Sequence, residues 1–200
     1  MVKNSVLLLL SLLGTSFGHS FEKLPFSYQI AYGNPDAPFK VVEYFSFTCP
    51  KCLKLIKEDF EVLKESYINP GKVYWVFHPD PADKLTLQAL ICLRKLNDSQ
   101  KKLFFETVSK NLDQKSLQVG CQVMQAVMDY FELPLPELGK ASFWESTEEF
   151  QLAFTFLRQE DMITSVPTIE INGQIFDEFP SRRFLEKKLD LLIARSASCE

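Results

Sequence analysis

The sequence predicts an α/β fold in which an all-helical insertion separates a β-α-β half from a β-hairpin–helix half. Apolar runs rich in β-branched and aromatic residues predict strands at 41–45 and 72–78, with helical spacing between them. Residues 81–163 then show mainly helical periodicity. Strand character returns at 165–176 around Asn172-Gly173, a strong signal for a two-residue hairpin turn.

The composition is that of an ordinary globular protein. Of the 200 residues, 46% are hydrophobic and 24% are charged, which allows one domain with a sizeable core or a smaller domain that carries an insertion. The net charge of -4 gives no reason to expect a nucleic-acid partner.

Residues 1–18 have the pattern of a secretory signal peptide. Lys3 precedes the apolar run from Val6 to Leu13, and Ser16-Phe17-Gly18 offers small residues where a signal peptidase cuts. The run is short for a transmembrane helix, and an uncleaved membrane anchor is the alternative. We expect a mature chain that begins near His19, in the periplasm or otherwise exported, where oxidising conditions make redox-active or bridged cysteines typical.

A buried strand leads directly into a pair of cysteines. Val41–Phe45 fits a strand that is buried on both faces, and after Cys52 the apolar residues take a helical spacing. Cys49 therefore lies at the start of a helix. The unpaired backbone N–H groups and the dipole of a helix N-terminus stabilise a thiolate there.

The neighbours of Cys49 strengthen this effect. Pro50 suits the first helical turn because it has no N–H to lose. Lys51 adds a positive charge, so we expect the pKa of Cys49 to lie well below the free-thiol value of about 8.5. Cys52 follows one turn later, close enough to close a small disulfide ring. This arrangement is typical of reversible thiol–disulfide exchange.

The first helix is expected from Cys52 to about Tyr67, and the strand Lys72–His78 then completes a β-α-β unit with parallel strands. Three helices of the insertion follow. Cys92 and Cys121 fall on the inward faces of the first and the third.

A fourth insertion helix begins at Ser146-Thr147-Glu148-Glu149, which has the capping-box pattern. After the hairpin, the last helix is expected over Ser181 to Ala194. The tail from Arg195 onward is expected to be mobile, and its Cys199 to be a free thiol without a catalytic role.

Three segments resemble the DsbA family of exported thiol–disulfide oxidoreductases, which have a thioredoxin fold with a helical insertion. They are the turn Gly33–Pro38, the strand and C-P-x-C turn Glu43–Cys52, and Val166-Pro167 followed by Asn172-Gly173. The resemblance covers nearly the whole mature chain. It implies a thioredoxin-like domain made of residues 19–80 and 164–195, and a helical insertion at 81–163.

The resemblance implies a role for each matching residue. Cys49 would be the attacking, solvent-facing thiolate, and Cys52 the buried resolving thiol. A cis Val166-Pro167 bond would pack against the pair, and its flanking backbone would bind extended substrate. Lys51 departs from the His of the best-known oxidant, but either cation stabilises a thiolate on Cys49.

Glu43 interrupts the apolar strand six residues before Cys49, at the position of the family's buried acid. A buried carboxylate costs several kcal/mol unless it is protonated or paired. We therefore interpret Glu43 as a proton relay to Cys52. The alternative is a glutamate on an edge strand that faces water.

The resemblance also suggests a structural disulfide between Cys92 and Cys121, because some family members staple the insertion. Two buried, inert thiols are the alternative. The only histidines are His19 and His78, so a four-ligand zinc site would need distant partners and we expect no metal site. The expected chemistry requires no bound cofactor.

The expected function is that of a thiol oxidase. The resemblance implies that such a protein introduces disulfides into unfolded or reduced secreted proteins and is recycled by a DsbB-like membrane oxidant. We expect a monomer. The alternatives are a reductase or isomerase of the same fold and a peptide-binding chaperone whose thiol pair is dispensable.

Overall fold

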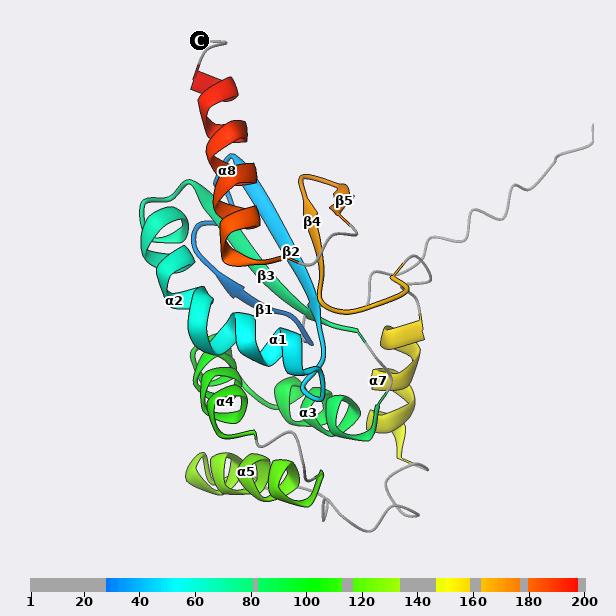
Figure 1. Ribbon diagram of the computed structural model, residues 1–200. Helices are drawn as coiled ribbons and strands as arrows, with labels where there is room; N and C mark the ends of the chain where they lie inside the picture. The colour runs from blue at the N-terminus through cyan, green and yellow to red at the C-terminus, as the bar shows by residue number, and fades with distance from the viewer. Residues whose placement is uncertain are drawn as a thin grey trace, which may run out of the picture.

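The centre of the molecule is a five-stranded mixed sheet with the strand order β1-β3-β2-β4-β5 (Figure 1). This computed structural model describes residues 28–80, 83–112, 117–133, 147–158, 163–176 and 180–197. The strands are β1 (Ile30–Tyr32), β2 (Phe39–Phe45), β3 (Val73–Pro79), β4 (Thr168–Ile171) and β5 (Gln174–Phe176).

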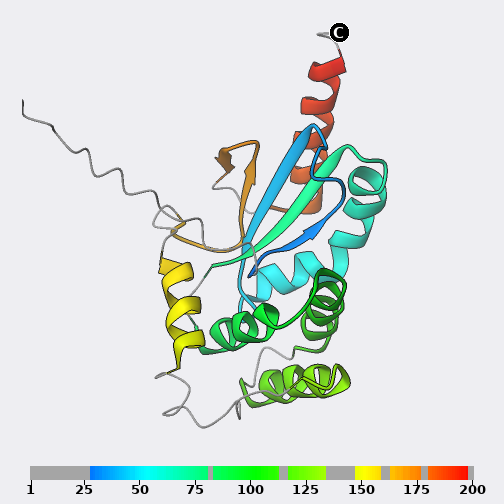
Figure 2. The same cartoon turned by 180° about the vertical axis from the view of Figure 1, so that it is seen from behind.

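Helices precede and follow the strands in the expected order. One continuous helix connects β2 to β3 and includes two π-helical segments: α1 (Pro50–Lys54), η2 (Leu55–Asp59), α2 (Phe60–Leu63) and η3 (Lys64–Ile68). Between β3 and β4 lie α3 (Lys84–Arg94), α4 (Asp98–Asn111), α5 (Leu117–Tyr130) and α7 (Glu148–Arg158). The last helix is α8 (Arg182–Ala197). Helices α3, α4 and α5 gather at one end of the sheet and α8 lies toward the other (Figures 1 and 2).

Strand β2 is central, and its neighbours fix its register. It pairs in parallel with β3, so that Glu43 lies opposite Phe77, and antiparallel with β4, where Glu43 lies opposite Ile169. Only Lys40 of this strand is exposed. The predicted β-α-β unit and the strand buried on both faces are thereby confirmed.

The insertion helices share the core of the sheet. Phe105 of α4 lies with its ring centroid 4.5 Å from that of Phe77 and 5.3 Å from that of Phe45. All three side chains are fully buried, and each such burial contributes about 2 kcal/mol of hydrophobic stabilisation. The inward helical face predicted for Cys92 is confirmed, since its side chain is inaccessible.

The hairpin between β4 and β5 is confirmed at Asn172-Gly173. Both residues have positive φ angles, 48° and 85°, as a two-residue turn of this kind requires. Asn172 Oδ1 also accepts a hydrogen bond of 2.7 Å from the backbone N–H of Lys40. The turn therefore ties the hairpin to the start of β2.

Two boundary predictions were wrong. The first helix begins at Pro50 rather than at the stated bound Cys52, and Cys49 is its N-cap, which confirms the position expected for Cys49 at the start of a helix. The expected mobile tail is helical as far as Ala197. The predicted signal peptide, His19 and Cys199 lie outside the described residues. Within the described ranges, no helix is long and apolar enough to span a bilayer.

The turn before β2 depends on Gly33. Its φ is 93°, and a Cβ added there would lie 2.7 Å from the carbonyl oxygen of Val73 and 2.9 Å from Ile68 Cγ2. Asn34 then continues the turn, since its side chain accepts the Asp36 N–H at 3.0 Å. The close approach to β3 requires a residue without a side chain.

We expect Gly33→Ala to lower the free energy of unfolding by at least about 2 kcal/mol, because the left-handed backbone and the contact with Val73 both oppose a Cβ. Gly71→Ala is the matched control. Gly71 has a φ of 76° but no atom within 4 Å of an added Cβ, so its loss should stay near about 1 kcal/mol. Urea unfolding measures both values, and equal losses would contradict the role of the close contact.

Candidate active site

Cys49 is the N-cap of α1, and its backbone is fixed on both sides. Its own N–H donates to Ser46 O at 3.2 Å, and its carbonyl accepts the Leu53 N–H at 3.0 Å. Its Sγ accepts the Cys52 N–H at 3.3 Å. The sulfur therefore occupies the position at which an N-cap side chain receives the free amides of a helix.

These contacts lower the pKa of Cys49 to about 6. The largest cause is the hydrogen bond from the Cys52 thiol, followed by the backbone N–H groups of Cys52 and Lys51 and the charge of Lys51, which together exceed the opposing effect of burial. The side chain is half-buried, so the thiolate can be reached from solvent. The predicted lowering of the pKa is confirmed in direction.

Cys52 has the opposite environment. It is completely buried, and burial raises its pKa, with a further increase from the hydrogen bond that it donates to Cys49. The amide of Ser46 opposes this change. The two thiols therefore differ strongly in acidity and in access.

Glu43 is completely buried, and its charge acts on the nearby Cys52 thiol. Burial raises its pKa well above the usual carboxyl value, the Trp75 indole lowers it in part, and the Cys49 thiolate raises it further. Neither carboxyl oxygen, nor Trp75 Nε1, makes a hydrogen bond of ordinary geometry. The alternative of an edge-strand glutamate facing water is wrong, because β2 is the middle strand.

The loop before β4 closes the other side of the pair. The Val166-Pro167 bond is cis, as the resemblance implies. The Cys49 thiol lies 3.5 Å from the carbonyl oxygen of Val166, to which it can donate. Val166 is half-buried and Pro167 is buried, so the carbonyl edge of this loop flanks the Cys49 sulfur.

Cys92 and Cys121 are free thiols in the structure, as are Cys49 and Cys52. Cys121 is only half-buried, and its Sγ donates to Gln88 Oε1 at 2.8 Å. Burial raises the pKa of Cys92, Lys95 opposes this in part, and the Cys121 thiol of α5 adds a smaller increase. A disulfide between them stays a prediction, which mass spectrometry of the alkylated, unreduced protein tests.

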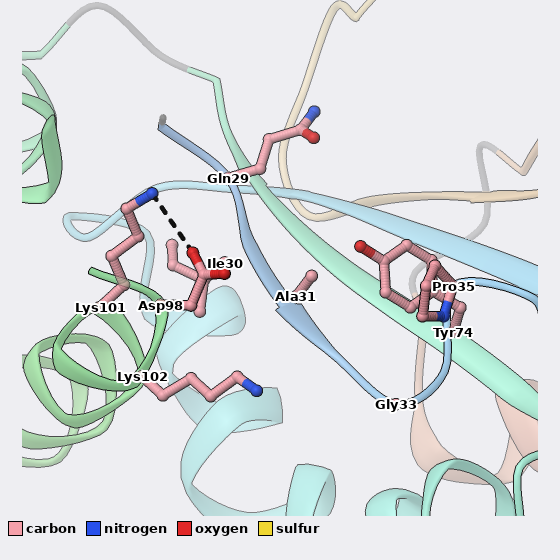
Figure 3. Close-up of a pocket in the computed structure, with 9 residues that line it drawn as sticks. All are labelled: Gln29, Ile30, Ala31, Gly33, Pro35, Tyr74, Asp98, Lys101 and Lys102. Atoms are coloured by element: carbon pink, nitrogen blue, oxygen red, sulfur yellow. Dashed lines mark ion pairs between the residues drawn. The ribbon is translucent and has the colours of Figure 1, made fainter. Parts of the chain in front are cut away.

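A separate cavity of about 320 Å³ lies at the β1 edge of the sheet (Figure 3). Its lining includes Gly33, Tyr74 and Lys101, and Lys101 Nζ lies 3.7 Å from Asp98 Oδ1. Neither cysteine of the pair lines it. We therefore assign the thiol chemistry to the surface around Cys49 and not to this cavity.

His78 is buried and lies beside Phe156, with its Nδ1 3.0 Å from Pro79 O. Among the described residues, no group of three or more histidine, cysteine or acidic side chains is arranged to hold a metal ion.

Three residues that shape the site were not expected from the sequence. Trp75 lies beside the Glu43 carboxyl, and Ser46 and Asp83 hold the turn that precedes Cys49. Asp83 could have been noticed as an N-cap, because an aspartate precedes the helical pattern of α3. Its contact with Ser46, 37 residues away, has no signal in the sequence.

Comparison with known proteins supports the assignment of the fold. A family model described as thioredoxin matches residues 27–190. The solved structure of alpha-DsbA1 from Wolbachia pipientis superposes with a TM-score of 0.66 at 19% identity, covering 88% of this chain and 96% of that one. BdbD from Bacillus subtilis gives 0.64 at 19% identity, with 82% and 92% covered.

Sequence relatives carry provisional names. A Rickettsia bellii protein named as a protein-disulfide oxidoreductase is 37% identical over 146 residues, which is 70% of this chain and 56% of that protein. A Bacillus anthracis protein named disulfide bond formation protein D is 24% identical over 178 residues, covering 84% and 80%. The alignment thus spans little more than half of the Rickettsia relative.

We expect the alkylation rate of Cys49 in the reduced protein to rise with a midpoint near pH 6, because only the thiolate reacts. Cys52→Ala should move the midpoint upward, since it removes the largest contribution to the lowered pKa. Cys52→Ser keeps a hydroxyl donor and should move it less. Mass spectrometry of iodoacetamide-treated samples measures the rates. A wild-type midpoint near 8.5 would contradict the site geometry.

Proposed function

Because this chain belongs to the thioredoxin family over residues 27–190, we propose that it is a protein-disulfide oxidoreductase of the DsbA type that introduces disulfides into exported proteins. One observation carries the proposal, the asymmetry of the cysteine pair. A half-buried Cys49 with a lowered pKa lies beside a buried Cys52 with a raised pKa. The names of the Rickettsia and Bacillus relatives point to the same chemistry.

The lowered pKa of Cys49 favours the oxidising direction. A stabilised Cys49 thiolate lowers the free energy of the reduced protein only, because the disulfide form has no thiolate. This stabilisation of the reduced form is complete above the pKa of an unfolded thiol, about 8.5. It is lost as the pH falls through the pKa of Cys49 in the folded protein, about 6. At neutral pH the reduced form is therefore favoured, and the disulfide tends to be passed to a substrate.

The oxidised enzyme would react in two exchange steps. A substrate thiolate attacks the accessible Cys49 sulfur, the Cys49–Cys52 bond breaks, and Cys52 leaves with the electron pair and takes up a proton. A second substrate thiolate then attacks the substrate sulfur of the mixed disulfide and releases Cys49 as a stabilised thiolate. Two electrons pass from the substrate dithiol to the enzyme. Cys52 is an unsuitable target for attack because it is buried.

Glu43 is the proposed proton relay for this exchange. The raised pKa of Cys52 means that its thiolate takes up a proton as it leaves, and the raised pKa of Glu43 makes its carboxyl a better-matched proton donor nearby. The negative charge of Glu43 contributes to the raised pKa of Cys52, after burial and the hydrogen bond to Cys49, which supports a location of Glu43 near this thiol. Lys51 and Pro50 tune Cys49, and the Val166-Pro167 loop would bind the substrate backbone.

The proposed thiol–disulfide exchange requires two kinds of protein partner, a substrate and an oxidant. The substrates would be unfolded or reduced secreted proteins, and a DsbB-like membrane oxidant would restore the disulfide. The proposal includes export to a periplasm-like compartment through residues 1–18, and a monomeric enzyme with residues 81–163 as an insertion into its thioredoxin-like domain. A reductase or isomerase of the same fold is the alternative. A peptide-binding chaperone with a dispensable thiol pair is another.

We expect the reduction potential of the Cys49–Cys52 pair to lie well above that of thioredoxin, about -270 mV, because the Cys49 thiolate stabilises the reduced form. Equilibration in glutathione buffers measures it. A potential near the thioredoxin value would indicate a reductase. Cys49→Ser tests the other alternative, since an oxidase loses all activity and a chaperone keeps its own.

We expect Glu43→Gln to slow exchange about 10²-fold near neutral pH and to flatten its pH profile, because the relay proton is removed. The variant should also be more stable than wild type at alkaline pH. A raised carboxyl pKa gives stability that is complete below about pH 4.3 and is lost as the pH rises through the folded value.

Glu170→Gln is the matched control for this experiment. Glu170 lies on the neighbouring strand β4, is half-buried, and accepts the Tyr44 hydroxyl at 2.9 Å. Its change should leave the pH profile of exchange unaltered. Stopped-flow measurement of substrate oxidation gives both profiles, and an unchanged rate across pH in Glu43→Gln would end the relay proposal.

A further inference from the structure

Asp83 is the N-cap of α3, the first helix of the insertion. Its Oδ1 accepts the backbone N–H groups of Leu85 at 3.0 Å and Thr86 at 2.9 Å. These two bonds are the usual contacts of an N-cap aspartate, whose side chain accepts N–H groups that have no partner within the helix.

The second oxygen of the same carboxylate makes a different set of contacts. Oδ2 accepts hydroxyl groups from Ser46 at 2.8 Å, Thr48 at 3.1 Å and Thr86 at 2.7 Å. Ser46 and Thr48 belong to the turn between β2 and Cys49, far from Asp83 in sequence. Hydrogen bonds to an ionised acceptor are about twice as strong as neutral ones. Asp83 thus joins the insertion to the turn that carries the nucleophile.

The turn held by Asp83 sets the backbone of both cysteines. Ser46 Oγ also accepts the Thr48 N–H at 3.0 Å, and Ser46 O accepts the Cys49 N–H at 3.2 Å. The backbone N–H of Ser46 donates to the Cys52 sulfur, which lowers the pKa of that thiol in part. Ser46 is buried, so its hydroxyl depends on protein partners for its hydrogen bonds.

We propose that Asp83 is a positioning residue for Cys49, which clamps the Ser46–Cys49 turn so that the amides at the start of α1 face the Cys49 sulfur. The inference rests on the proposed thiol–disulfide function of Cys49. The start of the insertion would thereby help to position the thiol. Strands β2 and β3 run in parallel, so the chain that leaves β3 reaches Asp83 at the same edge of the sheet as Cys49.

The competing explanation is that Asp83 only caps α3. Asp83→Ser separates the two roles, because one serine hydroxyl can accept the helix amides but cannot also accept three hydroxyl groups. Asn97→Ser is the matched control. Asn97 caps α4 through its side chain and the Gln100 N–H, and has no bond to the turn.

The test is the pH midpoint of Cys49 alkylation in the reduced protein without substrate. Asp83→Ser should raise the midpoint by about 0.5 to 1 unit, which is about three- to tenfold less thiolate below the midpoint. Loss of the negative charge alone would lower the midpoint, so the direction identifies the clamp. Asn97→Ser should leave it unchanged. A midpoint that is unchanged or lower in Asp83→Ser would overturn the proposal.

Thr48→Val provides a second, independent variant. Thr48 is exposed and the change conserves charge and shape, so the fold is retained even if Asp83→Ser fails to fold. Its midpoint should also rise, and the double variant should shift by less than the sum of the single shifts. Additive shifts, or no shift in Thr48→Val, would overturn the proposal. The alkylation measurement uses no substrate. If the midpoints shift as expected but the protein fails an oxidase assay, only the proposed function is rejected and the role of Asp83 stands.

Discussion

The parallel pairing of β2 with β3 is the constraint on which the site depends. Parallel neighbours need a crossover, and here the crossover helix begins at Pro50, directly after the turn that follows β2. Cys49 is therefore delivered to a helix N-terminus at the carboxyl edge of the sheet. Strand β3 ends at the same edge, which brings the first insertion helix and its Asp83 cap to the turn before Cys49. The position of Cys49 is thus a consequence of strand topology.

Burial then separates the two thiols. Cys49 gains amide and thiol donors while remaining half-exposed, whereas Cys52 is enclosed by the core and loses solvation. Glu43 and Trp75 Nε1 are buried without ordinary hydrogen bonds, which costs roughly 1–3 kcal/mol for each such group. The aromatic packing of Phe45, Phe77 and Phe105 offsets such a cost. Ser109 Oγ of α4 is also buried without a partner, but the carboxyl of Glu43 is the one such group beside the cysteine pair among the described residues, where a functional site is expected to break the usual rule.

The helical insertion is part of the same core rather than an appended unit. Phe105 packs directly on the sheet, Tyr32 of β1 donates to Glu106 of α4 at 3.1 Å, and Asp83 bonds to the turn before Cys49. A change in the packing of α3 or α4 would therefore displace the turn before Cys49, because Asp83 and Phe105 connect these helices to the turn and the sheet. The helices between β3 and β4 therefore share one packed core with the sheet and one hydrogen-bonded turn with the cysteine pair.

By itself, the sequence determined the local features of this protein. The apolar strand before Cys49, the helical spacing after it and the Asn172-Gly173 turn arise from neighbouring residues, so their elements were predicted to within a few residues. The complete burial of Glu43, the hydrogen bond between Asp83 and Ser46 across 37 residues and the partial exposure of Cys121 were decided only by the tertiary structure. The physical reason is that side-chain periodicity is set by adjacent residues. Burial and hydrogen bonding across the fold depend instead on which strands and helices the chain brings together.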